Sequence, residues 1–104
     1  MSEQWVLATS LEAVPQGDVI AVEARGREVA IYGVEGAVYA TDNICTHAHA
    51  RLCEGFLEGF EIECPMHQGK FDVRDGRPLC APVTEAIRAY RVKIEAGQVY
   101  LALE

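Results

Sequence analysis

The clearest pattern in the chain is a set of short runs rich in apolar, β-branched and aromatic residues, several of which alternate with polar residues. Such runs are typical of β-strands. The sequence contains five of them, at 18–23, 28–32, 37–41, 89–95 and 98–103. Gly26, Gly36 and the pair Ala96-Gly97 separate successive runs and predict tight hairpin turns.

No segment shows a sustained helical period beyond a single turn near residues 10–13. The pattern therefore predicts an all-β fold, a small antiparallel sandwich or barrel. A chain of 104 residues is long enough for one hydrophobic core, so we expect a single domain over 1–104. No apolar run approaches the ~20 residues that cross a bilayer, and the N-terminus lacks an export signal, which together predict a cytoplasmic protein.

Residues 43–82 interrupt the strand pattern. This stretch holds every cysteine and histidine of the chain and only short apolar pairs, so it predicts little regular structure. Its aromatic residues, such as Phe56, Phe60 and Phe71, argue against disorder. We therefore expect a metal centre to hold this segment in place.

The four cysteines, at 45, 53, 64 and 80, favour metal or redox chemistry over a disulfide framework, because a chain without an export signal keeps its thiols reduced. The net charge of −7 argues against nucleic-acid or membrane binding, which basic residues would support. Four glutamates and no basic residue lie within 54–63. They form either a solvated loop or a docking patch for basic redox partners.

The candidate metal ligands form two short motifs, Cys45-Thr-His47 and Cys64-Pro-Met-His67, with sixteen residues between them. Each motif offers one thiolate and one imidazole. Such a set is compatible with a structural zinc ion and also with a [2Fe–2S] cluster in which histidines replace two cysteines. The spacing alone leaves both alternatives open.

The residues around these ligands carry a family resemblance. The segments Asp42-Asn-Ile-Cys-Thr-His47 and Cys64-Pro-Met-His-Gln-Gly-Lys-Phe71 resemble the two cluster-binding boxes of Rieske iron–sulfur proteins, and the similarity extends from Trp5 to Leu103. It is closest to the small Rieske ferredoxins of bacterial aromatic-ring dioxygenases of the naphthalene or nitroarene type. The resemblance implies two β-sheets in a sandwich with an inserted cluster-binding subdomain at about 43–82.

The same resemblance implies a ligand set and a function. Cys45 and Cys64 would bind the inner iron, and His47 and His67 the outer one. The protein would be a monomeric one-electron carrier between an NAD(P)H-dependent flavin reductase and a terminal aromatic-ring dioxygenase, without catalytic activity of its own. Two alternatives stay open: a Rieske subunit held permanently in a larger oxidoreductase, and a zinc-stabilised interaction module.

Departures from high-potential Rieske proteins refine this expectation. Ala50 and Met66 stand where those proteins have a disulfide, and Gly69 and Phe71 stand where they have a serine and a tyrosine that donate hydrogen bonds to sulfur. Loss of such donors destabilises the reduced cluster. We therefore expect a reduction potential at the low end of the Rieske range, on the order of −150 mV.

The remaining chemistry-bearing residues are assigned structural roles. We expect His49 at the surface and Cys53 and Cys80 as small packed thiols. The segment Pro78 to Pro82 matches the proline-rich loop that covers the cluster in the family. The larger aromatic residues of the strands are expected to be buried or half-buried, namely Trp5, Tyr32, Tyr39 and Tyr90.

Overall fold

The computed structural model describes residues 4–46, 50–66, 69–80 and 85–103. These residues form β-strands and two short 3-10 helices, which confirms the predicted all-β fold. The elements are β1 (Gln4–Ser10), η1 (Leu11–Ala13), β2 (Asp18–Ala24), β3 (Arg27–Val34), β4 (Ala37–Asp42), η2 (Leu52–Glu54), β5 (Phe56–Glu58), β6 (Glu61–Glu63), β7 (Lys70–Asp72), β8 (Pro78–Cys80), β9 (Ala89–Tyr90), β10 (Val92–Glu95) and β11 (Gln98–Leu103).

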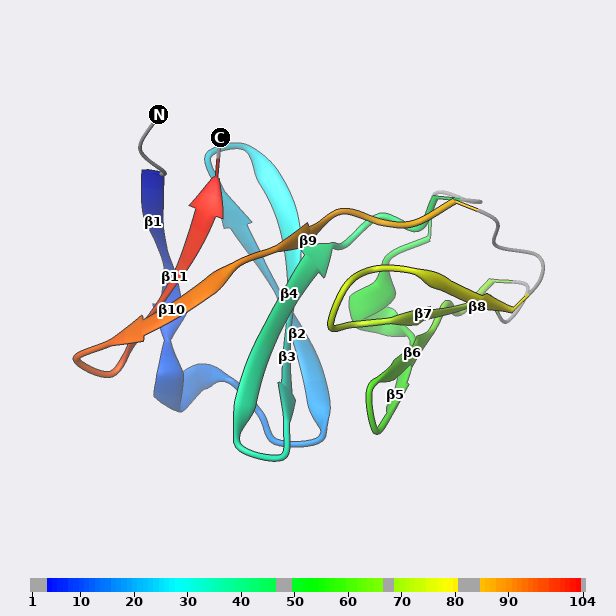
Figure 1. Cartoon of the computed structure of the whole chain (residues 1–104), viewed down its shortest axis with the longest axis horizontal. Helices are drawn as coiled ribbons and strands as arrows, with labels where there is room; N and C mark the ends of the chain where they lie inside the picture. The colour runs from blue at the N-terminus through cyan, green and yellow to red at the C-terminus, as the bar shows by residue number, and fades with distance from the viewer. Residues whose placement is uncertain (1–3, 47–49, 67–68, 81–84, 104) are drawn as a thin grey trace.

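The strands form three antiparallel sheets that lie side by side along the molecule (Figure 1). The outer sheet has the order β1-β11-β10, and the middle sheet the order β2-β3-β4-β9. The third, which we call the loop-side sheet, has the order β5-β6-β7-β8, and the candidate ligand Cys64 follows β6 directly. Outer and middle sheets form the sandwich that the sequence predicts.

The middle sheet is buried on both faces, as β3 shows most clearly. Val29 and Ile31 point to a core shared with the outer sheet, whereas Ala30, Tyr32 and Val34 point to a core shared with the loop-side sheet. Because successive side chains of a strand point to opposite faces, a strand buried on both sides reads as a continuous apolar run. The segment from Val29 to Val34 has this character.

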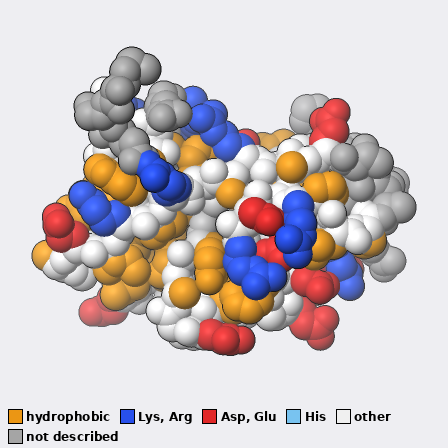
Figure 2. All heavy atoms as spheres, in the orientation of Figure 1, with side chains coloured by type: hydrophobic (Ala, Val, Ile, Leu, Met, Phe, Trp, Pro, Cys, Tyr) orange, Lys and Arg blue, Asp and Glu red, His pale blue; other side chains and the backbone are white. Residues whose placement is uncertain are grey.

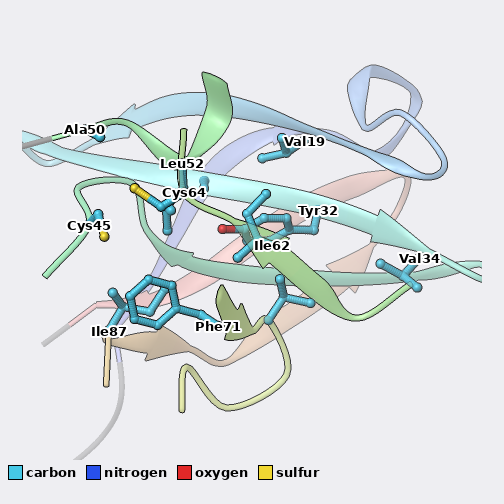
Figure 3. Packing of buried hydrophobic residues seen from close by; sticks show 12 residues of the cluster. Val19, Tyr32, Val34, Cys45, Ala50, Leu52, Ile62, Cys64, Phe71 and Ile87 are labelled. Carbon is cyan, nitrogen blue, oxygen red and sulfur yellow. The ribbon is translucent and has the colours of Figure 1, made fainter. Parts of the chain in front are cut away.

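Two hydrophobic cores follow from this arrangement. The sandwich core consists of Val14, Ala24, Val29, Ile31, Val38, Ala40, Tyr90, Val99, Leu101 and Leu103. The loop-side core, drawn in Figure 3, consists of Val19, Ala30, Tyr32, Val34, Cys45, Ala50, Leu52, Ile62, Cys64, Phe71, Val73 and Ile87. Two of the four candidate ligands are thus part of a hydrophobic core.

The predicted hairpins are confirmed. The turns at Arg25-Gly26, Glu35-Gly36 and Ala96-Gly97 all have positive φ at both positions, between 51° and 82°. Two consecutive residues with positive φ match the right-handed twist of the flanking strands, and glycine adopts this conformation at little cost. These glycines therefore set the register of the sandwich.

Two expectations about secondary structure need correction, and one strand is not predicted. The predicted strand 89–95 is interrupted at Arg91, because β9 pairs with β4 whereas β10 pairs with β11. The chain thus passes from the middle to the outer sheet at this residue. β1, which the pattern does not predict as a run, pairs along β11. Finally, the stretch 43–82 is richer in regular structure than expected, since it contains β5 to β8.

The aromatic residues lie where the sequence predicts them. Tyr32 and Tyr90 are buried, and Trp5 and Tyr39 are half-buried. The loop-side sheet lies within the stretch 43–82, although the division of the chain into domain and subdomain stays a prediction. Within the described residues, no helix has the length and apolar character needed to cross a membrane.

Candidate metal centre

The first candidate ligand loop follows β4, and the residues that flank it pair with each other. The Leu52 N–H donates to the Asn43 carbonyl at 2.7 Å, Ile44 and Arg51 form an isolated β-bridge, and the Cys45 N–H donates to the Ala50 carbonyl at 2.9 Å. These three contacts bring both ends of the segment 45–50 together. We call this segment the first ligand loop.

The second ligand loop, residues 64–69, is closed in the same way. Glu63 of β6 faces Lys70 of β7, and the Cys64 N–H donates to the Gly69 carbonyl at 2.7 Å. In both loops a cysteine amide therefore bonds to the carbonyl five residues further on. This equivalence places Cys45 and Cys64 at corresponding positions of two similar loops.

The two cysteines are buried next to each other. Cys64 is fully buried and Cys45 is 4% exposed, and Figure 3 shows both at the same end of the loop-side core. Burial raises the pKa of the Cys64 thiol to about 11, and the neighbouring Cys45 thiol adds to this shift. Both thiols are therefore placed to bind one soft metal, which would displace their protons.

The donor set fits an iron–sulfur cluster. Two neighbouring buried thiols are what a [2Fe–2S] cluster with two cysteine ligands requires on one iron, and each loop carries one histidine in the sequence. His47 and His67, like His49, lie outside the described residues. Among the residues that the structure describes, no group of three or more His, Cys, Asp or Glu side chains gathers as a metal site.

The other two cysteines have different surroundings. Cys53 is half-buried against the loop-side core, and its Sγ accepts a hydrogen bond from Asn43 Nδ2 at 3.4 Å. Cys80 is exposed on β8, so the prediction of a packed thiol is wrong for this residue. Cys80 ends β8, a three-residue strand at the edge of the loop-side sheet, and its side chain faces outward. All four cysteines are described, and none forms a disulfide.

The residues that distinguish this chain from high-potential Rieske proteins are also in place. Ala50 is buried and Met66 is 48% exposed. Phe71 is fully buried in the loop-side core, directly after the second ligand loop. Its ring therefore supplies apolar surface where a tyrosine would supply a hydroxyl group. Of the predicted covering loop, Pro78 to Cys80 form β8, and residues 81 and 82 lie outside the described residues.

The surface of the loop-side sheet combines exposed apolar and acidic side chains. Phe56 is 68% exposed, and Glu58 and Glu61 are exposed beside it. Figure 2 shows acidic side chains near this end of the molecule. The patch is not purely acidic, because Lys70 Nζ lies 3.9 Å from Glu61 Oε1. A partner would therefore meet mixed charges with an acidic excess.

Two buried polar residues that sequence reasoning missed support the loops. Asn43 precedes the first ligand loop, and Asp72 ends β7 after the second. Asp72 accepts hydrogen bonds from the Arg74 backbone N–H at 2.9 Å and from its guanidinium at 3.0 and 2.7 Å. The Arg74 guanidinium, 4.2 Å from the Phe60 ring centroid, also covers that ring, which packs edge-on against Tyr39 of the middle sheet. A short Asp-x-Arg motif is the only sequence signal for this contact.

Comparison with known proteins assigns the family. Residues 4–91 match the Rieske [2Fe-2S] domain family. The chain is 57% identical over 103 residues, 99% of both chains, to the ferredoxin component of the naphthalene 1,2-dioxygenase system of Pseudomonas aeruginosa.

Solved structures agree with this result. The ferredoxin of carbazole 1,9a-dioxygenase from Nocardioides aromaticivorans IC177 superposes with a TM-score of 0.92 at 35% identity, over 97% of this chain and 99% of that one. A chain in the complex of reduced oxygenase and oxidized ferredoxin in carbazole 1,9a-dioxygenase superposes with a TM-score of 0.89, also at 35% identity, over 97% of this chain and 94% of that one. With its paired loops, buried thiols and three-sheet fold, the chain belongs to the Rieske [2Fe–2S] family of the dioxygenase ferredoxin type and carries a [2Fe–2S] cluster.

Proposed function

We propose that Cys45 and Cys64 bind one iron of the cluster and that His47 and His67 bind the other. We further propose that the protein receives single electrons from a flavin-containing, NAD(P)H-dependent reductase and delivers them to a terminal aromatic-ring dioxygenase in the cytoplasm. The observation that carries this proposal is the pair of buried thiols at corresponding positions of two similarly closed loops.

The similarity to dioxygenase ferredoxins supports the role of an electron carrier. A relative that matches the chain over almost its whole length is named as the ferredoxin component of a naphthalene dioxygenase system. A structural neighbour comes from a complex of an oxygenase with its ferredoxin. The chain is therefore an electron-transfer component and not an enzyme by itself.

The bound cluster supplies the one-electron redox chemistry, and the chain supplies its surroundings. The buried residues of the loop-side core, above all Leu52, Ile62 and Phe71, keep water away from the thiol side of the site. Exposed apolar residues, such as Met66 in the second ligand loop and Leu79 on β8, offer a partner a surface that binds without desolvating charge. This arrangement insulates the cysteines and leaves apolar surface near them for a partner.

The ligand assignment is tested by electron paramagnetic resonance of the dithionite-reduced holoprotein. Mixed cysteine and histidine ligation predicts a rhombic spin-half signal whose average g value lies clearly below that of all-cysteine clusters. His47→Ala and His67→Ala should abolish this signal, whereas His49→Ala, the matched histidine control, should retain it. A colourless zinc protein, or loss of the signal in His49→Ala alone, would contradict the assignment.

The reductase step is tested separately. A purified NAD(P)H-dependent flavin reductase from a naphthalene dioxygenase system should bleach the visible absorbance of the wild-type holoprotein under anaerobic conditions. Reoxidation by the matching oxygenase, with its substrate and oxygen, should restore the absorbance. If dithionite reduces the protein but no such reductase does, the proposed electron donor is wrong and the cluster assignment is unaffected.

A further inference from the structure

The two ligand loops are closed in the same way but supported differently. The second loop connects β6 and β7, which are central strands of the loop-side sheet, with β5 and β8 on either side. The first loop follows the end of β4 and precedes η2, and a single isolated β-bridge flanks it. A hairpin without neighbouring strands is only marginally stable in water. Contacts other than strand pairing must therefore hold the first loop, and one of them is the Thr46 hydroxyl group, which donates to the Glu85 carbonyl at 2.9 Å.

Asn43 supplies further contacts at the two ends of the first loop. It lies two residues before Cys45, it is fully buried, and each of its polar groups is hydrogen-bonded. Its backbone N–H donates to the Glu28 carbonyl at 3.1 Å, and its carbonyl accepts from the Leu52 N–H at 2.7 Å. The backbone of Asn43 thus joins the start of β3 to the far end of the first loop.

The side chain of Asn43 extends this connection. Its Oδ1 accepts from the Cys53 N–H at 2.9 Å, and its Nδ2 donates to Cys53 Sγ and to Glu28 Oε1, both at 3.4 Å. Glu28 Oε1 in turn accepts from Arg51 Nε at 2.9 Å. One amide therefore ties the residues just after the first loop to the middle sheet.

We propose that Asn43 is a positioning residue for the cluster: its side chain does for the first ligand loop what strand pairing does for the second. This inference rests on the proposed ligand role of Cys45 and His47. An asparagine suits this place because its amide donates and accepts at once, and a buried amide with every group satisfied fixes one geometry. A carboxylate here would lose both donor contacts and would lie against the Glu28 carboxylate.

The test compares Asn43→Ala and Asn43→Asp with Thr41→Val. Thr41 is a matched control, since it is also fully buried near the end of β4, and its hydroxyl group bonds to Tyr32 Oη and to the Asp42 carbonyl, both at 2.9 Å. Each variant removes buried hydrogen bonds, so a general loss of stability should be common to all three. Only the Asn43 variants should affect the first loop.

Hydrogen exchange of the oxidised holoproteins, followed by mass spectrometry, reports on each loop. In Asn43→Ala, peptides from 43–55 should exchange about tenfold faster than in the wild type, while peptides from 61–73 keep their rate. Asn43→Asp retains the acceptor for the Cys53 N–H but loses both donor contacts and places a carboxylate against Glu28, so it should also accelerate exchange in the same peptides. Thr41→Val should leave the ratio between the two loops unchanged.

The spectrum of the reduced cluster gives a second measurement. It would stay unchanged if Asn43 only stabilised the fold. The Asn43 variants should shift the g values and the reduction potential, whereas Thr41→Val should reproduce those of the wild type. If Asn43→Ala does not retain its cluster, Asn43→Asp provides the same comparison. Equal acceleration of both loops, or wild-type exchange and g values in both Asn43 variants, would overturn the proposal.

Different measurements test the positioning role of Asn43 and the proposed ligand set. The exchange ratio reports on support of the first loop whether or not His47 is a ligand. The spectra of the wild type and of His47→Ala report on the ligands whether or not Asn43 supports the loop. A wild-type signal of mixed ligation together with uniform exchange in Asn43→Ala would therefore reject only the positioning role.

Discussion

The sandwich and the loop-side sheet are built in contrasting ways. The sandwich uses strands of up to eight residues joined by tight two-residue turns, and its core consists of aliphatic side chains with one tyrosine. The loop-side sheet consists of three-residue strands, and its core includes two thiols. Two buried polar residues lie at its borders: Asp72 ends β7, and Asn43 bonds to Cys53 before β5.

This contrast separates two sources of order. Long alternating strands bury enough apolar surface to be stable by themselves, whereas three-residue strands are too short for this. The loop-side sheet therefore depends on the middle sheet beneath it, on its polar anchors and on the cluster. The functional end of the molecule is thus the part that its own strand pairing stabilises least.

Removal of the cluster should produce the largest effect. We expect a chelator under reducing conditions to accelerate hydrogen exchange in residues 56–80 by roughly a hundredfold, because metal binding then no longer adds to the stability of the fold there. Exchange in 18–42 should change far less. Uniform unfolding of both regions would show that they form one cooperative unit.

The next effect concerns the Asp72 anchor. Hydrogen bonds from Arg74 hold the pKa of the buried Asp72 carboxyl group below its usual value. The contact therefore contributes its full stabilisation at pH values above the pKa of the unfolded state, about 3.9. This stabilisation is lost as the pH falls through the lower pKa of the folded state. Asp72→Asn should reduce the free energy of unfolding by about 2 kcal/mol at pH 7.

The difference from the wild type should shrink as the solution is acidified, which denaturant titrations at a series of pH values can follow. Asp75→Asn is the matched control, since Asp75 is exposed and pairs with Arg77 at 3.3 Å. Asp75→Asn should change the free energy of unfolding by no more than about 0.5 kcal/mol. A pH-independent difference for Asp72→Asn would show that packing, not charge, anchors the turn.

Hydrogen-bond donors added beside the loop-side core should tune the cluster without loosening the sheet. Gly69→Ser and Phe71→Tyr should each raise the reduction potential by about 40 mV, the one-electron equivalent of a hydrogen bond of about 1 kcal/mol. Spectroelectrochemical titration measures this shift. Phe60→Tyr adds the same hydroxyl group to the half-buried ring under Arg74 and should leave the potential unchanged. No rise in the first two variants would refute the hydrogen-bond explanation.

The smallest effect is expected at the surface. Reversal of the exposed Glu54, Glu58 and Glu61 to lysine should slow reduction by the reductase a few-fold at low ionic strength, because the opposite charge of a partner steers the encounter. The difference should vanish at high salt. Stopped-flow kinetics over a salt series measures it.

A matched control changes the net charge equally at the other end of the molecule. Glu12, Glu23 and Glu35 are exposed on the sandwich, and their reversal should have a smaller effect on the same rates. If both triple variants slow electron transfer alike, net charge and not the loop-side patch governs the encounter.

The sequence predicts the two regions unequally well. Strands such as β2 and β3 are long enough to show the apolar, β-branched composition of a strand, and glycines mark the turns between them. Strands β5 to β8 cannot reveal a period in three residues, so the stretch reads as irregular. The cysteine and histidine spacing identifies the two loops, and the family resemblance suggests the cluster.

Burial is harder to predict than chemistry. The pattern does not show that Asn43 is buried, because its contacts involve Glu28, which is distant in sequence. For Asp72 the Asp-x-Arg motif indicates the contact with Arg74 but not the burial. The same limit explains Cys80, whose exposure follows from its place on an edge strand. Tertiary contacts, not local pattern, determine these positions.

The pairing of β1 with β11 has a practical consequence. Gln4 faces Leu103, so the two ends of the described chain leave the protein side by side, at the opposite end of the molecule from the ligand loops (Figure 1). A tether attached there would present the redox-active end outward. Such an attachment would allow the carrier to be immobilised on an electrode, or fused to another protein, with the end that holds the ligand loops left accessible.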